Sequence, residues 1–515
     1  MRVHRSPSNS ATLGFILLGI YVVWFAPNVV AQTESRGGGI QVVDAATGRG
    51  VPLVELESTH SVRWVSDNNG VIYIDDSELL EQTIFFFVHG HGYEVDKDGF
   101  GYAGVRVELK RGKIVEVKVK RKLPAERLVR LTGIGQLRDS TLMGVDHSKF
   151  LVPLNGQVVG QDSIQTVPYQ GELLCIWGDT SQATYPLGLF RAAGARAPLR
   201  DSTGTRFDPS KGIAYDYFID ESKGFVRAMM PLPDRKEGVI WLDGLTKVQN
   251  DQNSEAVVAH YSRRAGLAEE LEHGICALDP QTMQFDVLRV IESLKEHRHP
   301  HGHAQIVEIE GKTWCVFGNP FPNLRVPATL KAIQDPTQYE WLTPLDTSGK
   351  KYEGWAWKKS AQDFTSKDEG IWLDSKTASK PEPHFLPSNI EQPSERIVFH
   401  NGSFAWNEFR QKWIVLGGRW LGKDSVLGEV WYTESDQLEG PYAQAVKVAT
   451  HHQQSFYNVF HHPYWDQENG KTIFFEGTFT ADFSGNPYKT PRYNYNQLLY
   501  RLDLEKLFEK AATQP

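Results

Sequence analysis

The sequence predicts an all-β protein in which a small β-sandwich precedes a five-bladed β-propeller. Three observations lead to this prediction: a strand–turn–strand unit that recurs five times, a run of alternating hairpins near the N-terminus, and an unusual composition. The chain has 45 Gly, 14 Trp and 19 Tyr in 515 residues. Such a composition suits many tight turns and blades whose faces are filled by large rings.

The first 31 residues have the layout of a secretory signal peptide. Basic residues and a histidine in the first five positions precede an apolar run at 13–25, and small residues follow at 29–31. We therefore expect the protein to be secreted, periplasmic or displayed at the cell surface. The alternative is an uncleaved membrane anchor, since the apolar segment approaches the length that spans a bilayer.

The sequence pattern of residues 38–121 predicts the β-sandwich. A strand and turn begin the segment, the Asp67-Asn-Asn-Gly70 turn separates two alternating strands, and Arg111-Gly112 separates two more. The run V-D-A-A-T-G-R-G-V-P, D-N-N-G and G-H-G-Y resembles the carboxypeptidase-regulatory-like domain, a transthyretin-like or immunoglobulin-like sandwich. The resemblance implies a spacer or binding accessory without catalytic residues.

The segment 127–505 predicts the propeller. Each unit has a strand, a turn, an apolar second strand and then a polar residue; the five units span 167–179, 241–261, 307–319, 406–419 and 464–476. A supersecondary unit that recurs at wide intervals is typical of blades that bury their faces against neighbours. We expect residues 494–503 to close the ring with residues 128–131, and residues 360–395 to form an insertion between blades three and four.

In a propeller, the start of each first strand and the end of each second strand crowd around one opening of the central tunnel. The repeat predicts which residues lie there: Asp162, Asp243, His303, Ser403 and Asn458 at first-strand starts, and Asp179, Tyr261, Asn319, Arg419 and Glu476 at second-strand ends. This predicted rim is rich in carboxylates, amides and basic side chains.

Four carboxylates of the rim are candidates for catalysis: Asp162, Asp179, Asp243 and Glu476. Cleavage of a glycosidic bond needs a protonated carboxyl to protonate the leaving oxygen and an ionised one to attack or to activate water. The alternative for Asp179 and Glu476 is purely structural, since carboxylates beside a turn often accept hydrogen bonds from its amides.

The five-bladed pattern with this rim resembles the superfamily of arabinanases, β-xylosidases and levansucrases. The "Gln-Asp … Trp-Gly-Asp-Thr" opening at residues 161–180 is similar to secreted propellers that include endo-D-arabinanases. The resemblance implies that Asp162 is the base or nucleophile, with Asp179 beside it, and that Asp243 tunes a pKa. The family's acid is a Glu on a middle blade, where this chain has His303 and Asn319, so Glu476 or His303 must replace it.

The run His297-Arg-His-Pro-His-Gly-His303 places four histidines at alternate positions, a possible metal site if the segment were a strand. Pro300 and Gly302 argue against a regular strand. His303 is the candidate ligand, and the resemblance implies calcium if the tunnel holds an ion; no cofactor is required otherwise. The candidate substrate-binding residues are His303, Asn319, Arg419, Tyr457, Asn458, His462 and Arg492.

The predicted function is that of an exported, monomeric glycoside hydrolase whose partner is a polysaccharide or oligosaccharide. The alternatives are a non-catalytic carbohydrate- or surface-binding propeller and a metal-dependent lyase that uses the histidines. A net charge of −8 without a basic stretch argues against a nucleic-acid partner or an acidic membrane surface. Cys175 and Cys315 share one position in two units, so we expect them in separate blades as buried apolar residues and expect no disulfide framework.

Overall fold

The computed structural model describes residues 37–151, 156–252, 254–267, 269–292, 299–359, 361–374, 382–486, 493–505 and 507–508. The predicted signal peptide, residues 1–31, lies outside the described residues. Within the described part, no helix combines the length and the apolar character that crossing a membrane requires.

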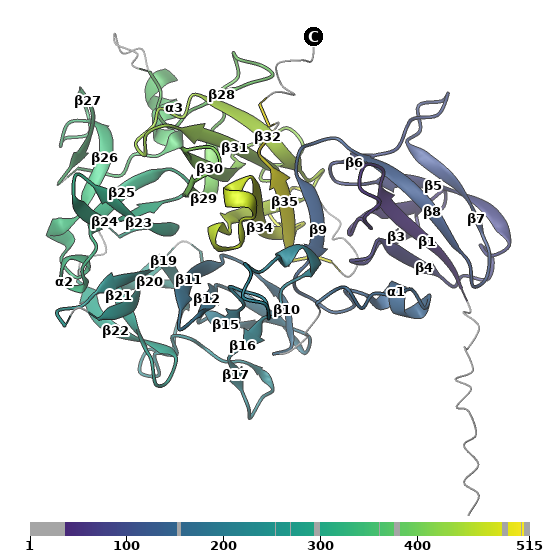
Figure 1. Ribbon diagram of the computed structural model, residues 1–515, viewed down its shortest axis with the longest axis horizontal. Coiled ribbons are helices and arrows are strands. Elements are labelled where there is room, and N and C mark those ends of the chain that lie inside the picture. The colour runs from purple at the N-terminus through teal and green to yellow at the C-terminus, as the bar shows by residue number, and fades with distance from the viewer. Residues whose placement is uncertain are drawn as a thin grey trace, which may run out of the picture. The chain divides into compact units, whose positions relative to one another are not determined.

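Two four-stranded sheets form the N-terminal sandwich that the sequence predicts (Figure 1). The first has the order β4 (Val71–Ile74), β1 (Gly38–Asp44), β8 (Ile114–Arg121), β6 (Tyr93–Glu94). The second has the order β3 (Arg63–Val65), β2 (Glu55–Ser58), β5 (Gln82–His89), β7 (Gly104–Leu109). Alternating residues of both sheets, among them Ile40, Leu56 and Phe86, form one buried apolar core.

Five antiparallel sheets form the blades of the propeller and confirm the predicted fold class. Blade 1 comprises β11 (Gln165–Tyr169), β12 (Glu172–Trp177), β15 (Ala193–Ala197) and β16 (Asp216–Tyr217). Blade 2 comprises β19 (Val239–Gln249), β20 (Glu255–Ala265), β21 (Glu269–Asp279) and β22 (Gln284–Ile291). Blade 3 comprises β23 (His303–Ile309), β24 (Lys312–Gly318), β25 (Pro322–Pro327), β26 (Glu340–Leu345) and β27 (Tyr352–Lys358).

Blade 4 comprises β29 (Phe399–Asn407), β30 (Lys412–Arg419), β31 (Glu429–Ser435), β32 (Gln444–Thr450) and β28 (Ser388–Asn389), which pairs in parallel with β32. Blade 5 comprises β33 (Ser455–His461), β34 (Thr472–Thr480), β35 (Asn496–Asp503) and β9 (Glu126–Arg130). The first strand of each sheet in this order is the innermost one, so β11, β19, β23, β29 and β33 surround the axis.

Short elements join the blades. A small sheet contains β10 (Val158–Gln161), β13 (Thr180–Gln182) and β14 (Tyr185–Leu189), and a hairpin contains β17 (Ile219–Asp220) and β18 (Phe225–Val226). The helices are α1 (Arg138–Leu142), α2 (Leu330–Ile333), α3 (Ser366–Asp374) and the 3-10 turns η1 (Pro209–Lys211), η2 (Pro336–Gln338), η3 (Pro463–Trp465) and η4 (Glu468–Gly470). The described residues of the predicted insertion at 360–395 include α3 and β28, which lie in sequence between β27 of blade 3 and β29 of blade 4; β28 is the outer edge strand of blade 4.

The backbone conformation of the turns explains why the repeat has glycine there. Gly171 and Gly311 connect the first two strands of blades 1 and 3 with φ values of +86° and +72°. L-residues with a side chain rarely adopt this left-handed region, so glycine is the favoured residue there. The second strands that follow are buried along their apolar stretches, and Cys175 (β12), Cys276 (β21) and Cys315 (β24) lie buried in three different blades.

The ring closes through β9, the first strand of the chain after the sandwich, and β35, its last strand. They pair antiparallel, with Leu498 opposite Arg130 and Leu499 opposite Val129. The strand pairing predicted from residues 494–503 and 128–131 is therefore confirmed. Closure removes the free edges that an open arrangement of blades would expose.

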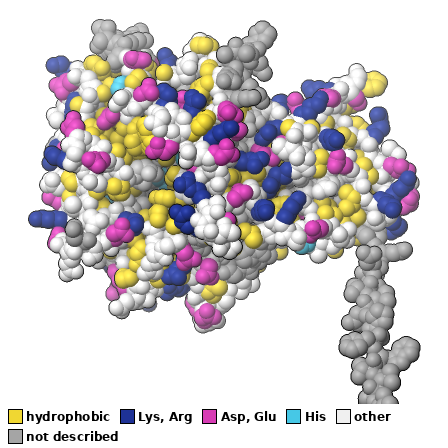
Figure 2. All heavy atoms as spheres, in the orientation of Figure 1, with side chains coloured by type: hydrophobic (Ala, Val, Ile, Leu, Met, Phe, Trp, Pro, Cys, Tyr) yellow, Lys and Arg dark blue, Asp and Glu magenta, His cyan; other side chains and the backbone are white. Residues whose placement is uncertain are grey.

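Charge is mixed on the face of the molecule that Figure 2 shows. Lys and Arg side chains are interspersed with Asp and Glu over this face, without a broad area of one sign. Such a surface lacks the clustered basic footprint by which proteins bind nucleic acids.

Replacement of Leu499 by Ala tests the ring closure. Leu499 is fully buried in the apolar cluster that joins blades 5 and 1. We expect Leu499→Ala to lower the free energy of unfolding by about 2–5 kcal/mol, because it leaves a cavity in this cluster. Urea denaturation followed by Trp fluorescence measures the change, and Phe100→Ala, at a 90% exposed position, is the control. Equal stability of the two variants would contradict this account of the closure.

Candidate active site

A cavity of about 1340 Å³ opens at one end of the propeller axis, and residues of all five blades line it. Its polar lining includes Asp162, Ser163, Gln165, Asp179, Asp243, His301, His303, Asn319, Asn401, Tyr457, Asn458 and Tyr495. Trp241, Trp420 and Phe483 add aromatic surface. The size and the mixture of aromatic and polar groups are typical of a binding site for a small molecule or an oligomer segment.

Asp162 lies between β10 and β11, at the inner end of blade 1. The Tyr457 hydroxyl, from blade 5, donates to its carboxylate at 3.0 Å. Burial raises the pKa of Asp162, while hydrogen bonds from Tyr457, Tyr495 and Ser163 oppose the rise. These donors favour the ionised form of Asp162 over the neutral one.

Asp179 follows the end of β12 and lies on the same cavity wall. Burial and the charge of Asp162 raise the pKa of Asp179 to about 7, and the hydrogen bond from Trp241 lowers it only in part. The Trp241 ring nitrogen donates to Oδ1 at 3.3 Å, and the Tyr495 hydroxyl donates to the Asp179 backbone carbonyl at 2.9 Å. Two interacting carboxyl groups in one cavity titrate as a pair, and the charge of Asp162 is one of the causes that raise the pKa of Asp179.

Asp243 lies on β19 at the edge of the cavity near His301. The Gly302 amide donates to its Oδ1 at 2.9 Å, and His301 Nδ1 lies 3.5 Å from Oδ2. Desolvation lowers the pKa of His301, but the hydrogen bond and charge of Asp243 outweigh it, so the pKa lies above its ordinary value. The pair places a proton donor at the cavity wall.

Gly302 is needed at this position for two reasons. Its φ is +82°, and a Cβ built on it would lie 2.4 Å from the Gly318 carbonyl oxygen. Its carbonyl accepts hydrogen bonds from Gln165 Nε2 at 3.0 Å and from the Gly244 amide at 2.8 Å. Gly302 therefore joins blades 1, 2 and 3 at the axis.

His303 lies at the start of β23, at the position that the sequence predicts. It is buried, and burial lowers its pKa to about 4, so the ring is neutral. Calcium takes about six to eight oxygen ligands. The His303 ring instead packs on Phe460, with 4.4 Å between centroids, and in the described parts of the chain it joins no cluster of three metal-ligating side chains.

Amide side chains connect the remaining blades around the axis. Asn319 Nδ2 donates to Asn401 Oδ1 at 3.3 Å, Asn401 Nδ2 donates to Asn458 Oδ1 at 2.7 Å, and Asn458 Nδ2 donates to Ser163 Oγ at 2.6 Å. Asn458 reaches this place because β33 carries an extra residue opposite β34, and its φ is +52°. Such a bulge redirects a side chain, and Asn tolerates the left-handed backbone better than most residues.

Glu476 does not reach the cavity. It lies in the middle of β34, its side chain is fully buried, and its Oε2 lies 3.2 Å from Nε2 of the equally buried His462. The repeat places Glu476 at a strand end because it underestimates the length of β34. Tyr261 lies in the middle of β20 for the same reason and donates its hydroxyl hydrogen to Glu272 at 2.7 Å.

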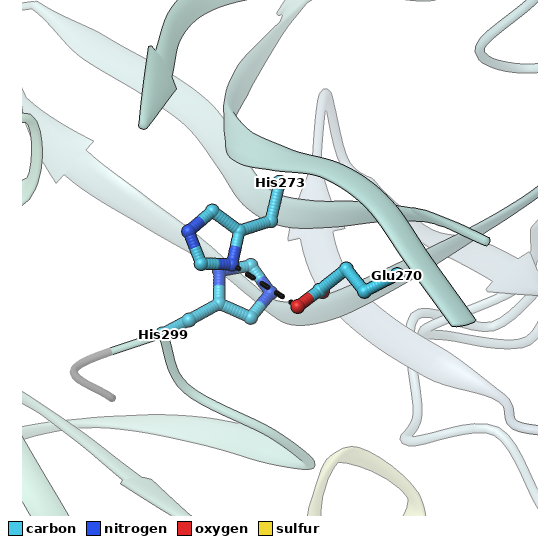
Figure 3. Close-up of side chains that lie close together, drawn as sticks. All are labelled: Glu270, His273 and His299. Atoms are coloured by element: carbon cyan, nitrogen blue, oxygen red, sulfur yellow. Dashed lines mark ion pairs between the residues drawn. The ribbon is translucent and has the colours of Figure 1, made fainter. Parts of the chain in front are cut away.

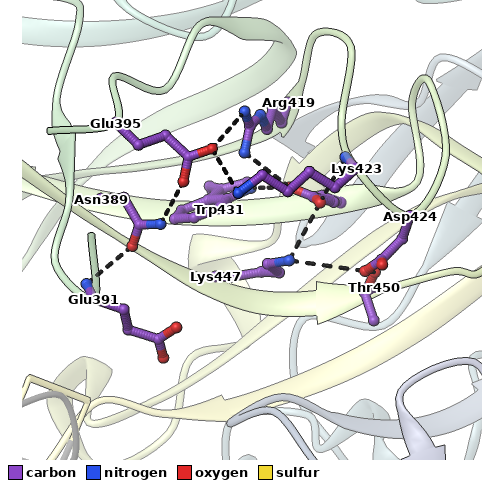
Figure 4. A network of polar contacts seen from close by, with 10 residues as sticks. Asn389, Glu391, Glu395, Arg419, Lys423, Asp424, Trp431, Lys447 and Thr450 are labelled. Atoms are coloured by element: carbon purple, nitrogen blue, oxygen red, sulfur yellow. Dashed lines mark hydrogen bonds and ion pairs between the residues drawn. The ribbon is translucent and has the colours of Figure 1, made fainter. Parts of the chain in front are cut away.

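Arg419 ends β30 but is not among the residues that line the cavity. Figure 4 shows it in a network of charged side chains instead. Its guanidinium lies 3.0 Å from Glu395 and 3.6 Å from Glu429, in a network that also holds Lys423 and Lys447. Ser403 is buried and accepts a hydrogen bond from the His461 amide at 2.8 Å. Arg492 lies outside the described residues.

The cavity also contains residues that the repeat did not single out: Trp241, His301, Asn401 and Tyr495. Trp241 precedes Asp243 by two positions, and alternation along a strand places both on one face. His301 is two positions before His303 in the histidine run. Asn401 and Tyr495 reach the cavity only through the arrangement of blades 4 and 5, for which the sequence carries no local signal.

Comparisons with known proteins give structural likeness only. No family model and no curated protein matches the chain. Among solved structures, it is similar to a Bacteroides ovatus protein described provisionally as a hydrolase, with 11% identity, 72% of this chain and 91% of that one covered, and a TM-score of 0.40. An exo-1,5-α-L-arabinanase from a bovine ruminal metagenomic library has 10% identity, 68% and 94% coverage, and a TM-score of 0.33.

An α-L-arabinofuranosidase of Fusarium graminearum is similar at 10% identity, with 75% of this chain and 99% of that one covered and a TM-score of 0.35. At this degree of likeness, the chemistry of the cavity has to be inferred from its own side chains.

Asp179→Asn tests the electrostatics of the carboxylate pair. The folded-state pKa of Asp179, about 7, lies above the unfolded value of about 4, so the folded chain binds this proton more tightly. The charged carboxylate therefore destabilises the fold progressively as the pH rises from about 4 to about 7, and fully above that.

We expect Asp179→Asn to raise the melting temperature by a few degrees at pH 8 and to change it little at pH 4.5. Differential scanning fluorimetry at the two pH values measures the difference. The same shift at both pH values would contradict the raised pKa.

Proposed function

We propose that the protein is an exported glycan-active enzyme, a glycoside hydrolase whose catalytic groups are Asp162 and Asp179. The observation that supports it is the placement of two carboxyl groups in one cavity of about 1340 Å³, where burial raises the pKa of both and that of Asp179 to about 7. Hydrolysis of a glycosidic bond requires one protonated and one ionised carboxyl at the same bond.

In this proposal Asp179 is the general acid. Its pKa of about 7 keeps a large fraction protonated near neutral pH, so it can donate a proton to the leaving glycosidic oxygen as the bond to the anomeric carbon breaks. Asp162 is the ionised partner, because Tyr457 donates to it. It attacks the anomeric carbon to form a glycosyl–enzyme ester that water then hydrolyses, or it removes a proton from the water that attacks. In the second case the water oxygen and its remaining hydrogen become the anomeric hydroxyl, and the proton held by Asp162 passes to solvent as Asp179 is reprotonated.

His303 and Glu476 fit the role of acid less well than Asp179. A general acid must come within hydrogen-bond reach of the proton acceptor, and Glu476 is fully buried outside the cavity lining. His303 lines the cavity but is neutral, with a pKa of about 4. His301 and Asp243, at the wall, are placed to orient sugar hydroxyls.

A carbohydrate suits the rest of the lining. Amide groups of Asn319, Asn401 and Asn458 offer donors and acceptors, and Trp420 offers an aromatic face that is itself stacked on His400 with 5.1 Å between centroids. Sugars present hydroxyl edges and apolar ring faces, and this lining offers partners to both.

Export and the accessory role of the sandwich belong to the same proposal. The support for export is the sequence of residues 1–31, and N-terminal sequencing of the mature protein tests it. The support for the accessory role is the fold of residues 38–121 and their resemblance to a spacer domain. Binding of the isolated segment to the preferred glycan would test the second point once that segment is shown to fold.

A polysaccharide panel tests the proposed hydrolysis. Arabinans, xylans, fructans and sulfated algal glycans are incubated with the wild type, and released reducing ends are measured. We expect Asp162→Asn and Asp179→Asn to reduce kcat by about 10²- to 10⁴-fold, while Asp220→Asn, at the end of β17 and outside the cavity lining, leaves it unchanged. Loss of turnover in Glu476→Gln, with Asp179→Asn active, would move the acid to Glu476. Glycan binding without turnover by the wild type would establish a binding propeller instead.

The pH profile tests the two roles separately. We expect kcat/KM of the wild type to fall as the pH rises through about 7, because Asp179 then loses the proton that it must donate. Product configuration, followed by NMR from the first minutes, tells whether Asp162 acts as nucleophile or as base. An active enzyme whose kcat/KM is constant from pH 6 to 9 would contradict Asp179 as the acid.

A further inference from the structure

A second group of polar side chains lies next to the segment that carries His301 and His303 into the cavity. It consists of Glu270 and His273, on β21, and His299, which precedes β23 (Figure 3). One ligating atom from each of the three side chains lies within 4.8 Å of the others. None of the three has a role in the proposed hydrolysis.

A β-bulge brings Glu270 and His273 together. Residues three apart on a regular strand point to opposite faces. In the pairing of β20 with β21, Arg263 is opposite Glu272 and Arg264 is opposite Glu270, so Leu271 is an extra residue. The bulge shifts the alternation by one residue and places Glu270 and His273 on the same side, where His273 Nδ1 lies 3.6 Å from Glu270 Oε2.

The burial of the His299 ring is the feature of this cluster that the fold alone does not explain. It is 5% exposed, and neither ring nitrogen has a hydrogen-bond partner within the part of the chain that the structure describes. Leaving buried polar atoms unsatisfied costs about 1–3 kcal/mol, so such a side chain needs a ligand. The neutral imidazole ring is the form that coordinates metals.

We propose that Glu270, His273 and His299 bind a divalent transition-metal ion, with Zn²⁺ as the expected one. Two imidazole nitrogens and one carboxylate oxygen are a ligand set that zinc favours, and such three-ligand sites keep a fourth position for water. The cluster differs from the calcium site that the sequence analysis expected at His303, both in its residues and in its donor atoms.

The geometry requires modest rearrangement. Tetrahedral zinc with bonds of about 2.1 Å sets its ligand atoms about 3.4 Å apart, and the Glu270–His273 pair, at 3.6 Å, is already close to that. The His299 ring is stacked on His273, with 4.7 Å between centroids and 15° between planes. It must rotate so that a nitrogen lone pair points at the ion, and we expect the stacking to be lost on binding.

The surroundings orient the carboxylate. Arg264 Nη1 lies 3.7 Å from Glu270 Oε1, so the other oxygen is the one left toward the histidines. Arg264 also covers the Trp241 ring at 5.4 Å. Outer partners of this kind fix the orientation of metal-ligating carboxylates. An ion bound here would tie residues 299–303 to blade 2 and so hold His301 at the cavity.

Zinc binding to the full-length protein tests this inference. Protein stripped with a chelator is titrated with Zn²⁺ by calorimetry, and Co²⁺ is used as a spectroscopic substitute. We expect one ion per chain, a visible Co²⁺ spectrum of tetrahedral type, and an anomalous-diffraction peak between the three side chains. His299→Ala and Glu270→Gln should each weaken Zn²⁺ binding by about 100-fold or more, since even loss of an outer partner costs about 10- to 100-fold.

His89→Ala is the matched control, because His89 also faces a glutamate, Glu57, at 3.2 Å but belongs to no three-residue cluster among the residues that the structure describes. It should bind Zn²⁺ like the wild type. Thermal melts of the metal-free proteins show whether each variant is folded. The absence of Zn²⁺ binding by the wild type would overturn the proposal. So would unchanged affinity in folded Glu270→Gln, or an anomalous peak between His301 and Asp243.

Discussion

The arrangement of the site depends on a chain of hydrogen bonds around the propeller axis. Blades of a propeller contact only their neighbours, so nothing in the repeat itself fixes the diameter of the opening. Here Gln165 and Gly302 join blades 1, 2 and 3, and the sequence Asn319, Asn401, Asn458 and Ser163 joins blades 3, 4, 5 and 1. This closed ring of hydrogen bonds supports the side chains that line the cavity.

The same enclosure produces the chemistry. A carboxylate at an open rim would ionise near its ordinary pKa, whereas burial beside a second carboxylate favours the neutral form of one of the two. Tyr457 donates to Asp162 and opposes the rise in its pKa that burial causes, as the Trp241 ring nitrogen does for Asp179. Blade 1 thus carries both carboxyl groups, and the neighbouring blade 5 carries the Tyr457 hydroxyl that donates to one of them.

Much of this could be predicted from sequence because the repeat is local. A Gly turn followed by an apolar strand and a polar residue places Asp179 and Asn319 at strand ends. The length of a strand cannot be predicted from the local repeat. Strand β34 is longer than the repeat pattern predicts, and Glu476 therefore lies inside the blade. The position of Arg419 outside the cavity could not be predicted for another reason. Its partner Glu429 lies ten positions further along the chain and comes close to it only after two strands have paired.

The two β-bulges show the same limit of prediction from a local sequence pattern. Asn458 turns into the cavity, and Glu270 turns to His273, because one extra residue shifts the alternation of each strand. Periodicity predicts which residues share a face only where pairing is regular. In this chain the irregular pairings are the places where polar side chains gather.

The ring closure has a consequence for the order in which the chain can fold. The strand β9 is synthesised before any blade, and its partner β35 is synthesised last. Four blades can therefore assemble along the growing chain while the edge of β9 waits unpaired, and such an edge is prone to associate with other chains. A ribosome that stalls after blade 4 is complete but before β35 (Asn496–Asp503) is made would release a protein with most of its core formed and its seam open, a natural substrate for quality control.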